Sequence, residues 1–188
     1  MQGMQISEST ILRMLAETDT QRQAFTIIVQ QYSRPLYCMV RRMVLVHDDA
    51  DDVLQNTFLK AWKSLPDFEG KSKISTWLYR IAVNEALDFL RRKNTYSVVS
   101  GDEKELLGVY SRLLADEYFD GNETEAKLHA AVSQLPEVQR TVFQMKYFEE
   151  MKYSEISKIL GTSQGALKAS YHLAVKKISE FLKNERIE

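Results

Sequence analysis

The chain has 188 residues, of which 44% are hydrophobic and 27% charged, and its formal net charge is −1. This composition is typical of a globular protein and excludes a collagen-like or wholly disordered chain. The single cysteine, Cys38, excludes an internal disulfide and has no companion at a metal-ligand spacing, so we expect no metal and no cofactor. The N-terminus lacks the pattern of a signal peptide, and no segment approaches about 20 consecutive apolar residues, which predicts a cytoplasmic protein without membrane insertion.

Charge is segregated along the chain. Residues 47–69 carry six acidic residues against two lysines, a net −4, and residues 71–93 reverse this to +4. Residues 94–127 return to −5, and residues 151–183 reach +4. An ordinary solvated surface explains any one such run, but two basic modules separated by an acidic connector favour contact with nucleic acid.

The first part of the chain predicts amphipathic helices in series. From Phe25 to Met43 apolar residues recur every three or four positions, and Pro35 is expected to break or kink this helix by starting a second segment. The stretch HDDADDVLQNTFLKAW then opens with aspartates suited to an N-cap and to the positive end of the helix dipole. Its apolar side is expected to carry Ala50, Leu54, Phe58, Ala61 and Trp62, and its other side Asp51, Asp52, Gln55, Asn56, Leu59 and Lys60.

Residues 75–92, STWLYRIAVNEALDFLRR, predict a further long helix after a turn at residues 65–70, with Ser75 as its N-cap. Aromatic faces, amides and basic groups are the parts that hold single-stranded bases, although burial of Trp77 and Tyr79 in a core would explain the same pattern. The expected core residues are Trp77, Leu78, Ile81, Ala82 and Leu87, and the expected polar stripe is Arg80, Asn84, Asp88 and Arg91.

Strand-like alternation is absent, so we predict an all-α fold of two small helical domains, residues 1–93 and 128–188, joined by a flexible acidic linker, residues 94–127. The linker has one short predicted helix near residues 106–114. Helical periodicity resumes at Leu128. Helices are expected in LHAAVSQL, in PEVQRTVFQMKYF with its proline in the first turn, in YSEISKIL, and from about residue 164 to 184.

The segment YSEISKILGTSQGALKASYHLAVKKI has the layout of a helix-turn-helix, in which Gly161 allows the turn and Thr162 or Ser163 caps the second helix. A plain helical hairpin remains the alternative. The expected core residues are Ile156, Ile159, Leu160, Leu167, Ala174 and Ile178. The residues expected nearer the outer surface, within reach of phosphates or base edges, are Gln164, Lys168, Ser170, Tyr171 and His172.

No catalytic constellation accompanies these elements, so we do not expect an enzyme. His47 lies beside Asp48 and Asp49 without a nucleophile signature, and an acidic helix start explains the aspartates more simply. His129 and His172 have no neighbouring metal-ligand pattern, and no glycine-rich phosphate loop occurs.

The motifs DADDVLQNTFLKAW, FEGKSKISTWLYRIAVNEALDFLRR and LPEVQRTVFQMKYFEEMKYSEISKILGTSQGALKASYHLAVKKI occur in this order. Over roughly residues 20–93 and 128–183 the chain resembles bacterial extracytoplasmic-function sigma factors. The resemblance implies an initiation factor, monomeric when free, that binds RNA polymerase core and directs it to promoter DNA. It also implies contact with the flap of the second-largest subunit, an anti-sigma factor as a candidate partner, and an acidic linker that mimics RNA.

The resemblance assigns roles to three groups of residues. Those matching the surface that docks on the clamp helices of the largest polymerase subunit are Asp51, Asp52, Gln55 and Asn56. Those matching the part that captures the melted non-template strand at the minus-10 element are Lys71, Lys73, Trp77, Arg80 and Asn84. The helix-turn-helix matches the domain that reads the minus-35 element as duplex, with Gln164, Lys168, Ser170, Tyr171 and His172 as contact candidates.

This chain departs from the family pattern in its recognition helix. Many members have arginine at the positions of Ser170 and Leu173, so fewer cations are available here for phosphate contacts. The competing interpretation from the residues alone is a dimeric one-component regulator that uses the same helix-turn-helix, with residues 20–93 as a ligand or dimerisation domain.

Overall fold

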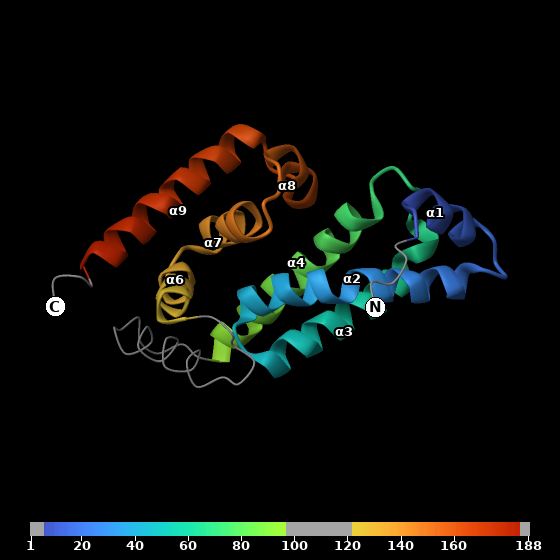
Figure 1. The fold of residues 1–188 in the computed structure, drawn as a ribbon, viewed down its shortest axis with the longest axis horizontal. Coiled ribbons are helices and arrows are strands. Elements are labelled where there is room, and N and C mark those ends of the chain that lie inside the picture. Colours follow the sequence, from blue (N-terminus) through green and yellow to red (C-terminus); the bar gives the residue numbers. More distant parts are fainter. Residues whose placement is uncertain (1–5, 97–121, 185–188) are drawn as a thin grey trace. The chain divides into compact units, whose positions relative to one another are not determined.

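The computed structural model describes residues 6–96 and 122–184 (Figure 1). Every regular element in these ranges is helical, which confirms the all-α prediction. The chain divides into two compact units, Met1–Arg91 and Arg92–Glu188. The short helix predicted near residues 106–114 lies outside the described residues.

Unit 1 is a bundle in which α1 and α3 both pack against α2. Ser7 caps α1, because its Oγ accepts a hydrogen bond from the N–H of Thr10 at 3.3 Å. The backbone N–H of Ile74 donates to the Glu8 carboxylate, which ties the start of α4 to α1. The elements are α1 (Glu8–Ala16), α2 (Gln21–Val44), α3 (His47–Ser64), the 3₁₀ turn η1 (Leu65–Asp67) and α4 (Ile74–Tyr96).

α2 runs without interruption through Pro35, so the prediction of a second segment starting there is wrong. Pro35 is exposed, whereas Ile28 before it and Leu36 after it are fully buried. Burial of apolar side chains on both sides of the proline offsets the loss of one backbone hydrogen bond. The helix ends at Val44, and its C-cap, Leu45, has a φ of 67° in the left-handed region and donates its N–H to the carbonyl of Arg41 at 2.9 Å.

The starts of α3 and α4 differ from the sequence expectation. Val46 is the N-cap of α3 and gives no side-chain cap, while Asp48 and Asp49 lie in the first turn, where their charge still faces the positive helix end. α4 begins at Ile74, so Ser75 is not its N-cap. Ile74 is fully buried and hydrogen-bonded to α1, a tertiary contact that no local pattern contains.

The buried stripe of α3 is rotated from the predicted one. Val53 and Thr57 are buried, whereas Leu54 and Phe58 are half-buried and Trp62 is 38% exposed. Thr57 tolerates burial because its hydroxyl donates to the Val53 carbonyl at 2.7 Å. In α4, Leu78 and Ala82 are buried as predicted, Trp77, Ile81 and Leu87 are half-buried, and Val83, Glu85 and Ala86 are buried without having been predicted.

The first described helix of unit 2 begins earlier than the apolar pattern indicated. α6 starts at Glu123, inside the stretch predicted as linker, because Asn122 caps it by accepting from the N–H of Glu125 at 3.0 Å. Pro136 is the N-cap of α7. The elements are α6 (Glu123–Ser133), α7 (Glu137–Phe143), the π-helical turn η2 (Gln144–Phe148), α8 (Tyr153–Leu160) and α9 (Gln164–Asn184).

The core of the helix-turn-helix is the predicted one. Ile156, Ile159, Leu167, Ala174 and Ile178 are buried, and Leu160 is half-buried. The predicted second helix of this unit does not stay α-helical to its end, because its last turn, η2, widens into a π-helix. In the described ranges, no helix is long and apolar enough to cross a membrane.

Candidate functional site

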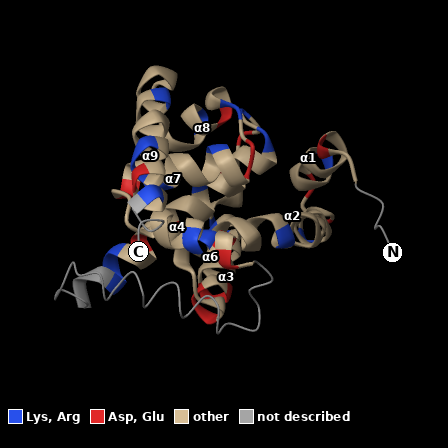
Figure 2. Cartoon of the chain, turned by 60° about the vertical axis from the view of Figure 1, so that its left-hand side comes forward, with Lys and Arg blue, Asp and Glu red and all other residues tan. Residues whose placement is uncertain are grey.

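The polar side of α3 is solvent-facing, as predicted. Asp51, Asp52, Gln55 and Asn56 are all exposed, and Figure 2 shows acidic residues on this helix. The Asp51 carboxylate lies 3.5 Å from Nε2 of His47. The other ring nitrogen of His47, Nδ1, lies 2.6 Å from the Tyr37 hydroxyl. α2 therefore positions His47, which in turn lies against one of the four candidate carboxylate and amide groups.

Two apolar residues on the same side of α3 were not predicted as site residues. Leu59 is 52% exposed and Trp62 is 38% exposed. Leu59 follows Asp52 by seven residues and Gln55 by four, spacings that place the three side chains on one face. A leucine among polar residues in a helix is the sequence signal that could have identified it. We call Asp51, Asp52, Gln55, Asn56 and Leu59 the α3 surface.

An aromatic pair joins the loop before α4 to the helix itself. Phe68 and Trp77 stack with ring centroids 4.6 Å apart and an angle of 27° between the planes. Trp77 is half-buried, so it is both packed and partly accessible. The Lys71 ammonium pairs with the Glu69 carboxylate. The remaining predicted minus-10 residues, Lys73, Arg80 and Asn84, are all exposed.

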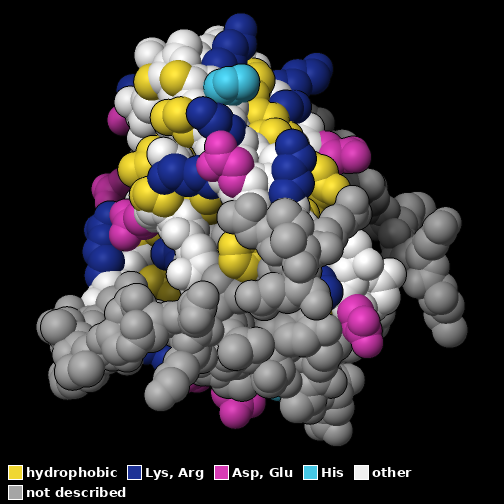
Figure 3. All heavy atoms as spheres, turned by 90° about the vertical axis from the view of Figure 1, so that its left-hand side faces the viewer, with side chains coloured by type: hydrophobic (Ala, Val, Ile, Leu, Met, Phe, Trp, Pro, Cys, Tyr) yellow, Lys and Arg dark blue, Asp and Glu magenta, His cyan; other side chains and the backbone are white. Residues whose placement is uncertain are grey.

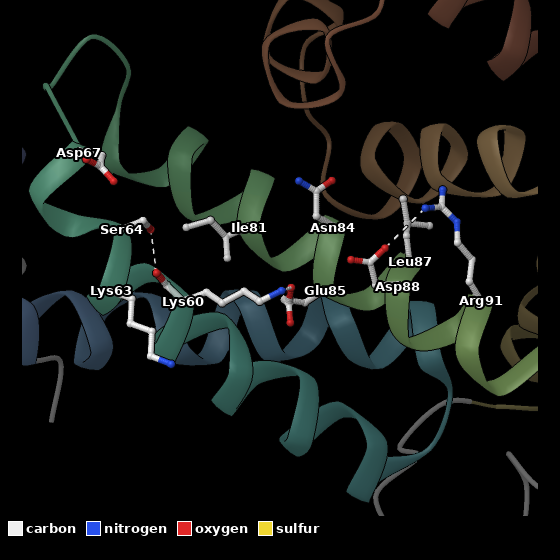
Figure 4. Close-up of a pocket in the computed structure, with 10 residues that line it drawn as sticks. All are labelled: Lys60, Lys63, Ser64, Asp67, Ile81, Asn84, Glu85, Leu87, Asp88 and Arg91. Carbon is white, nitrogen blue, oxygen red and sulfur yellow. Dashed lines mark hydrogen bonds and ion pairs between the residues drawn. The ribbon is translucent and has the colours of Figure 1, made fainter.

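A groove of about 560 Å³ lies between the end of α3 and the polar side of α4 (Figure 4). Lys60 crosses from α3 to pair with Glu85 of α4, whose side chain is only 7% exposed. Asp88 and Arg91 pair at 3.5 Å further along α4. Asn84 also lines the groove, and in Figure 4 its amide points away from the Lys60–Glu85 pair. The groove therefore offers a neutral amide among side chains of both charges.

The recognition helix α9 presents three of its five predicted contact residues to solvent. Gln164, Lys168 and His172 are exposed, and Ser170 is half-buried. Ser163 is the cap, because its Oγ accepts from a backbone N–H in the first turn of α9 at 3.3 Å.

Tyr171, the fifth predicted contact residue, is half-buried and packs against rings of other helices. Its ring lies 5.8 Å from that of Phe143 at an angle of 15°, and 6.4 Å from that of Tyr153. It packs against the buried cluster that includes Phe143, Ala174 and Ile178. Burial raises the pKa of the Tyr171 hydroxyl, and the neighbouring Tyr153 and Tyr147 raise it further. The ring is therefore half-buried at the edge of this cluster, and contact of Tyr171 with DNA stays a prediction.

Two residues beside Lys168 were missed. The Lys168 ammonium lies 5.9 Å from the centre of the Tyr153 ring, and that of Lys146 lies 5.4 Å from the same ring. Lys146 is held by donating to the carbonyl of Met151 at 3.1 Å. Cations from α9 and η2 thus converge on the first residue of α8. Because Lys146 and Lys168 are 22 positions apart, no local spacing could have identified this basic cluster.

A metal centre has no candidate in the described part of the chain, where no group of three or more His, Cys, Asp or Glu side chains could hold an ion.

Comparisons with known proteins place both units in one class. The model of Sigma-70 region 2 matches residues 28–95, and that of Sigma-70 region 4 matches residues 125–178. The unit with the α3 surface and the unit with the helix-turn-helix therefore correspond to the two domains of a sigma-70 type protein.

Similar proteins identify the group of sigma-70 type proteins to which the chain belongs. The chain is 32% identical over 160 residues to the ECF RNA polymerase sigma factor SigW of Bacillus subtilis, covering 80% of this chain and 84% of the relative. It is 30% identical over 174 residues to the RNA polymerase sigma-H factor of Pseudomonas aeruginosa, covering 86% and 87%. The chain belongs to the extracytoplasmic-function sigma factors, which are transcription initiation factors that act with RNA polymerase core and promoter DNA.

Solved structures share the fold. CnrH, in complex with the cytosolic domain of CnrY, superposes with a TM-score of 0.68 at 21% identity, covering 94% of this chain and 97% of that one. The sigma factor RpoE of Bartonella quintana, in complex with the anti-sigma factor NepR, gives a TM-score of 0.63 at 21% identity, covering 85% and 96%. With both domains assigned to sigma regions, the comparisons favour the initiation factor over the dimeric regulator.

Proposed function

We propose that unit 1 docks on the clamp helices of the largest polymerase subunit through the α3 surface. The observation that carries this proposal is that Asp51, Asp52, Gln55 and Asn56 are all exposed, while the opposite side of the helix is buried. None of these four side chains is part of the buried core. Carboxylates and amides that leave the core undisturbed are suited to hydrogen bonds and ion pairs with a partner.

The test is a pull-down of bacterial core RNA polymerase by the full chain. Asp52→Arg combined with Gln55→Ala should lose core binding while circular dichroism stays unchanged. The matched control is Asp19→Arg combined with Gln23→Ala, which makes the same two changes at exposed positions outside α3. Equal retention of core by both double variants would place the docking surface elsewhere.

We further propose that unit 1 captures the melted non-template strand of the minus-10 element. Lys71, Lys73 and Arg80 would follow phosphates, Trp77 would offer its ring, and Asn84 would bond a base edge. In support, Lys73, Arg80 and Asn84 are exposed, and Asn84 lies in a groove of sufficient size for a base. Asn84→Ala in reconstituted holoenzyme should reduce promoter opening, followed by permanganate reactivity of unpaired thymines, more than Lys63→Ala on the groove's other side.

Unit 2 is proposed to read the minus-35 element as duplex and to contact the flap of the second-largest subunit. The support is the exposed Gln164, Lys168 and His172 on α9 and the basic cluster of Lys146 and Lys168 beside them. Phosphate contacts make binding salt-dependent, with a slope that falls by about one unit for each cation removed. Lys146→Gln and Lys168→Gln should each lower the slope, whereas removal of a lysine that does not reach DNA leaves it unchanged.

An inhibitory partner is proposed to mask the α3 surface. The support is that the RpoE neighbour was solved with an anti-sigma factor, and that this surface combines acidic groups with the exposed Leu59. Leu59→Asp should weaken core binding and inhibitor binding together. Inhibitor binding that survives this change would place the inhibitor on another surface.

A further inference from the structure

The solvent-facing side of α9 carries a line of apolar residues. Ala166, Ala169 and Leu173 are all exposed, and Leu173 is exposed to 46%. Their spacing of three and four places them on one side of the helix. They lie away from the buried side, formed by Leu167 and Ala174, so the core does not need them. We call these three residues the apolar strip.

A line of basic residues runs beside the apolar strip. Lys168, His172 and Lys176 follow one another at intervals of four and are exposed. Lys168 also belongs to the basic cluster, in which its ammonium and that of Lys146 both lie over the Tyr153 ring. Figure 3 shows lysine and arginine side chains lying among exposed hydrophobic ones on one face of the molecule. The solvent-facing side of α9 thus has a basic edge next to an apolar one.

The basic edge favours one occupant for this side of the helix. Residues 151–183 have a net charge of +4, which complements phosphates and not a generally apolar partner. A recognition helix lies in the major groove with its early turns toward the base edges. The apolar strip begins in the first turn of α9 and reaches its third, so an edge of the base pairs is the surface that it meets there.

The chemistry of that surface selects the base. The C5-methyl of thymine is the apolar group that major-groove base edges present, and alanine and other apolar side chains contact it. Guanine is read by the fork of an arginine or by a lysine, and Ala166, Ala169 and Leu173 have no donor to offer. Leu173 occupies a place where a cation would have allowed guanine or phosphate contact.

We propose that the apolar strip reads thymine methyl groups in the duplex that α9 binds, while the basic edge holds the adjoining phosphates. The inference rests on the proposed reading of duplex DNA by unit 2. Leu173, the longest side chain of the strip, makes the principal methyl contact. The chain therefore selects promoters with thymine at defined upstream positions rather than guanine.

The test uses holoenzyme reconstituted from the full chain and bacterial core polymerase. Duplexes that bind are selected from promoter fragments randomised over ten upstream base pairs. Each thymine of the selected duplexes is then replaced in turn by uracil, which removes the methyl group alone. At one or more positions this should weaken binding roughly three- to fivefold, the effect of losing one buried methyl contact.

Two variants separate the strip from the rest of the helix. Leu173→Ala should abolish the difference between thymine and uracil at one position. Val175→Ala, at an apolar residue that is 38% exposed on another side of α9, should preserve it.

Three outcomes would overturn the inference. If selected duplexes bind equally well with uracil, the methyl contacts are absent although unit 2 still reads duplex DNA. If Leu173→Ala lowers assembly with core instead, the strip faces the polymerase. If holoenzyme forms but no upstream sequence is enriched, the proposed duplex reading fails together with the inference.

Discussion

The two units use aromatic residues differently at their candidate DNA surfaces. In unit 1, Trp77 of α4 stacks on Phe68 of the preceding loop and is half-buried. In unit 2, Tyr171 lies in a network of rings around Phe143, which is only 3% exposed. An aromatic residue in a candidate DNA-binding helix is therefore not by itself a contact residue. Whether such a residue packs or contacts DNA depends on whether its neighbouring rings belong to a loop or to a core.

The largest effect on stability should come from removing Phe143, the ring at the centre of the aromatic network in unit 2. Phe143→Ala is expected to cost about 3–5 kcal/mol, the usual loss for a buried phenylalanine. Phe68→Ala in unit 1 breaks one aromatic pair. This should cost about 0.5–1.5 kcal/mol in addition to the loss of buried apolar area. Amide hydrogen exchange, resolved by residue, reports each unit separately. Equal losses of protection in both units would contradict the difference described above.

A second effect concerns the ion pair that links α3 and α4. Lys60→Ala leaves the nearly buried Glu85 without its cation and should destabilise unit 1 by about 1–3 kcal/mol. Lys63→Ala, at an exposed lysine three residues later, should change stability by less than about 0.5 kcal/mol. Combining Lys60→Ala with Glu85→Leu should recover part of the loss in urea unfolding. Failure to recover would mean that Lys60 stabilises through its aliphatic stem instead.

Alanine substitutions at two glycines of the helix-turn-helix should change stability by smaller amounts, in opposite directions. Gly161 has a φ of +66°, and an added Cβ would meet nothing within 4 Å, so Gly161→Ala should cost about 1–2 kcal/mol from backbone strain alone. Gly165 has equal space but lies in the helix, so Gly165→Ala should stabilise unit 2 by about 0.5–1 kcal/mol. Thermal unfolding measures both. A stabilising Gly161→Ala would show that the turn changes conformation.

The smallest expected effect is that of removing the Tyr171 hydroxyl, a change that distinguishes packing of this residue from DNA contact. Tyr171→Phe keeps the ring, so holoenzyme affinity for upstream duplex should change by less than about twofold. A loss larger than this would show that the Tyr171 hydroxyl contacts DNA.

The ionisation of Tyr171 gives an independent check of its packing. Its folded pKa is raised above the ordinary value of 10.0, so the stabilising effect of the neutral hydroxyl is present below about pH 10 and is lost as pH rises beyond it. Tyr171→Phe should therefore remove one late-ionising tyrosine from an ultraviolet titration and reduce the alkaline loss of stability. An unchanged titration would mean that the hydroxyl is solvated.

Helices, their approximate limits and most exposed polar faces followed from the sequence, because three- and four-residue periodicity is a local property of the chain. The exposed α3 residues and the polar stripe of α4 were predictable for this reason. α9 runs from Gln164 to Asn184 as expected, since Ser163 caps it and Gly161 precedes it. Family membership followed in the same way, because it depends on the order of these motifs.

Contacts between distant residues required the folded chain. The continuity of α2 through Pro35, the start of α4 at Ile74 and the inward packing of Tyr171 all depend on partners in other elements. The same is true of the basic cluster that Lys146 forms with Lys168. Local periodicity assigns a side to a residue but does not say what lies against it, since burial and ion pairing arise between helices that the chain brings together only on folding.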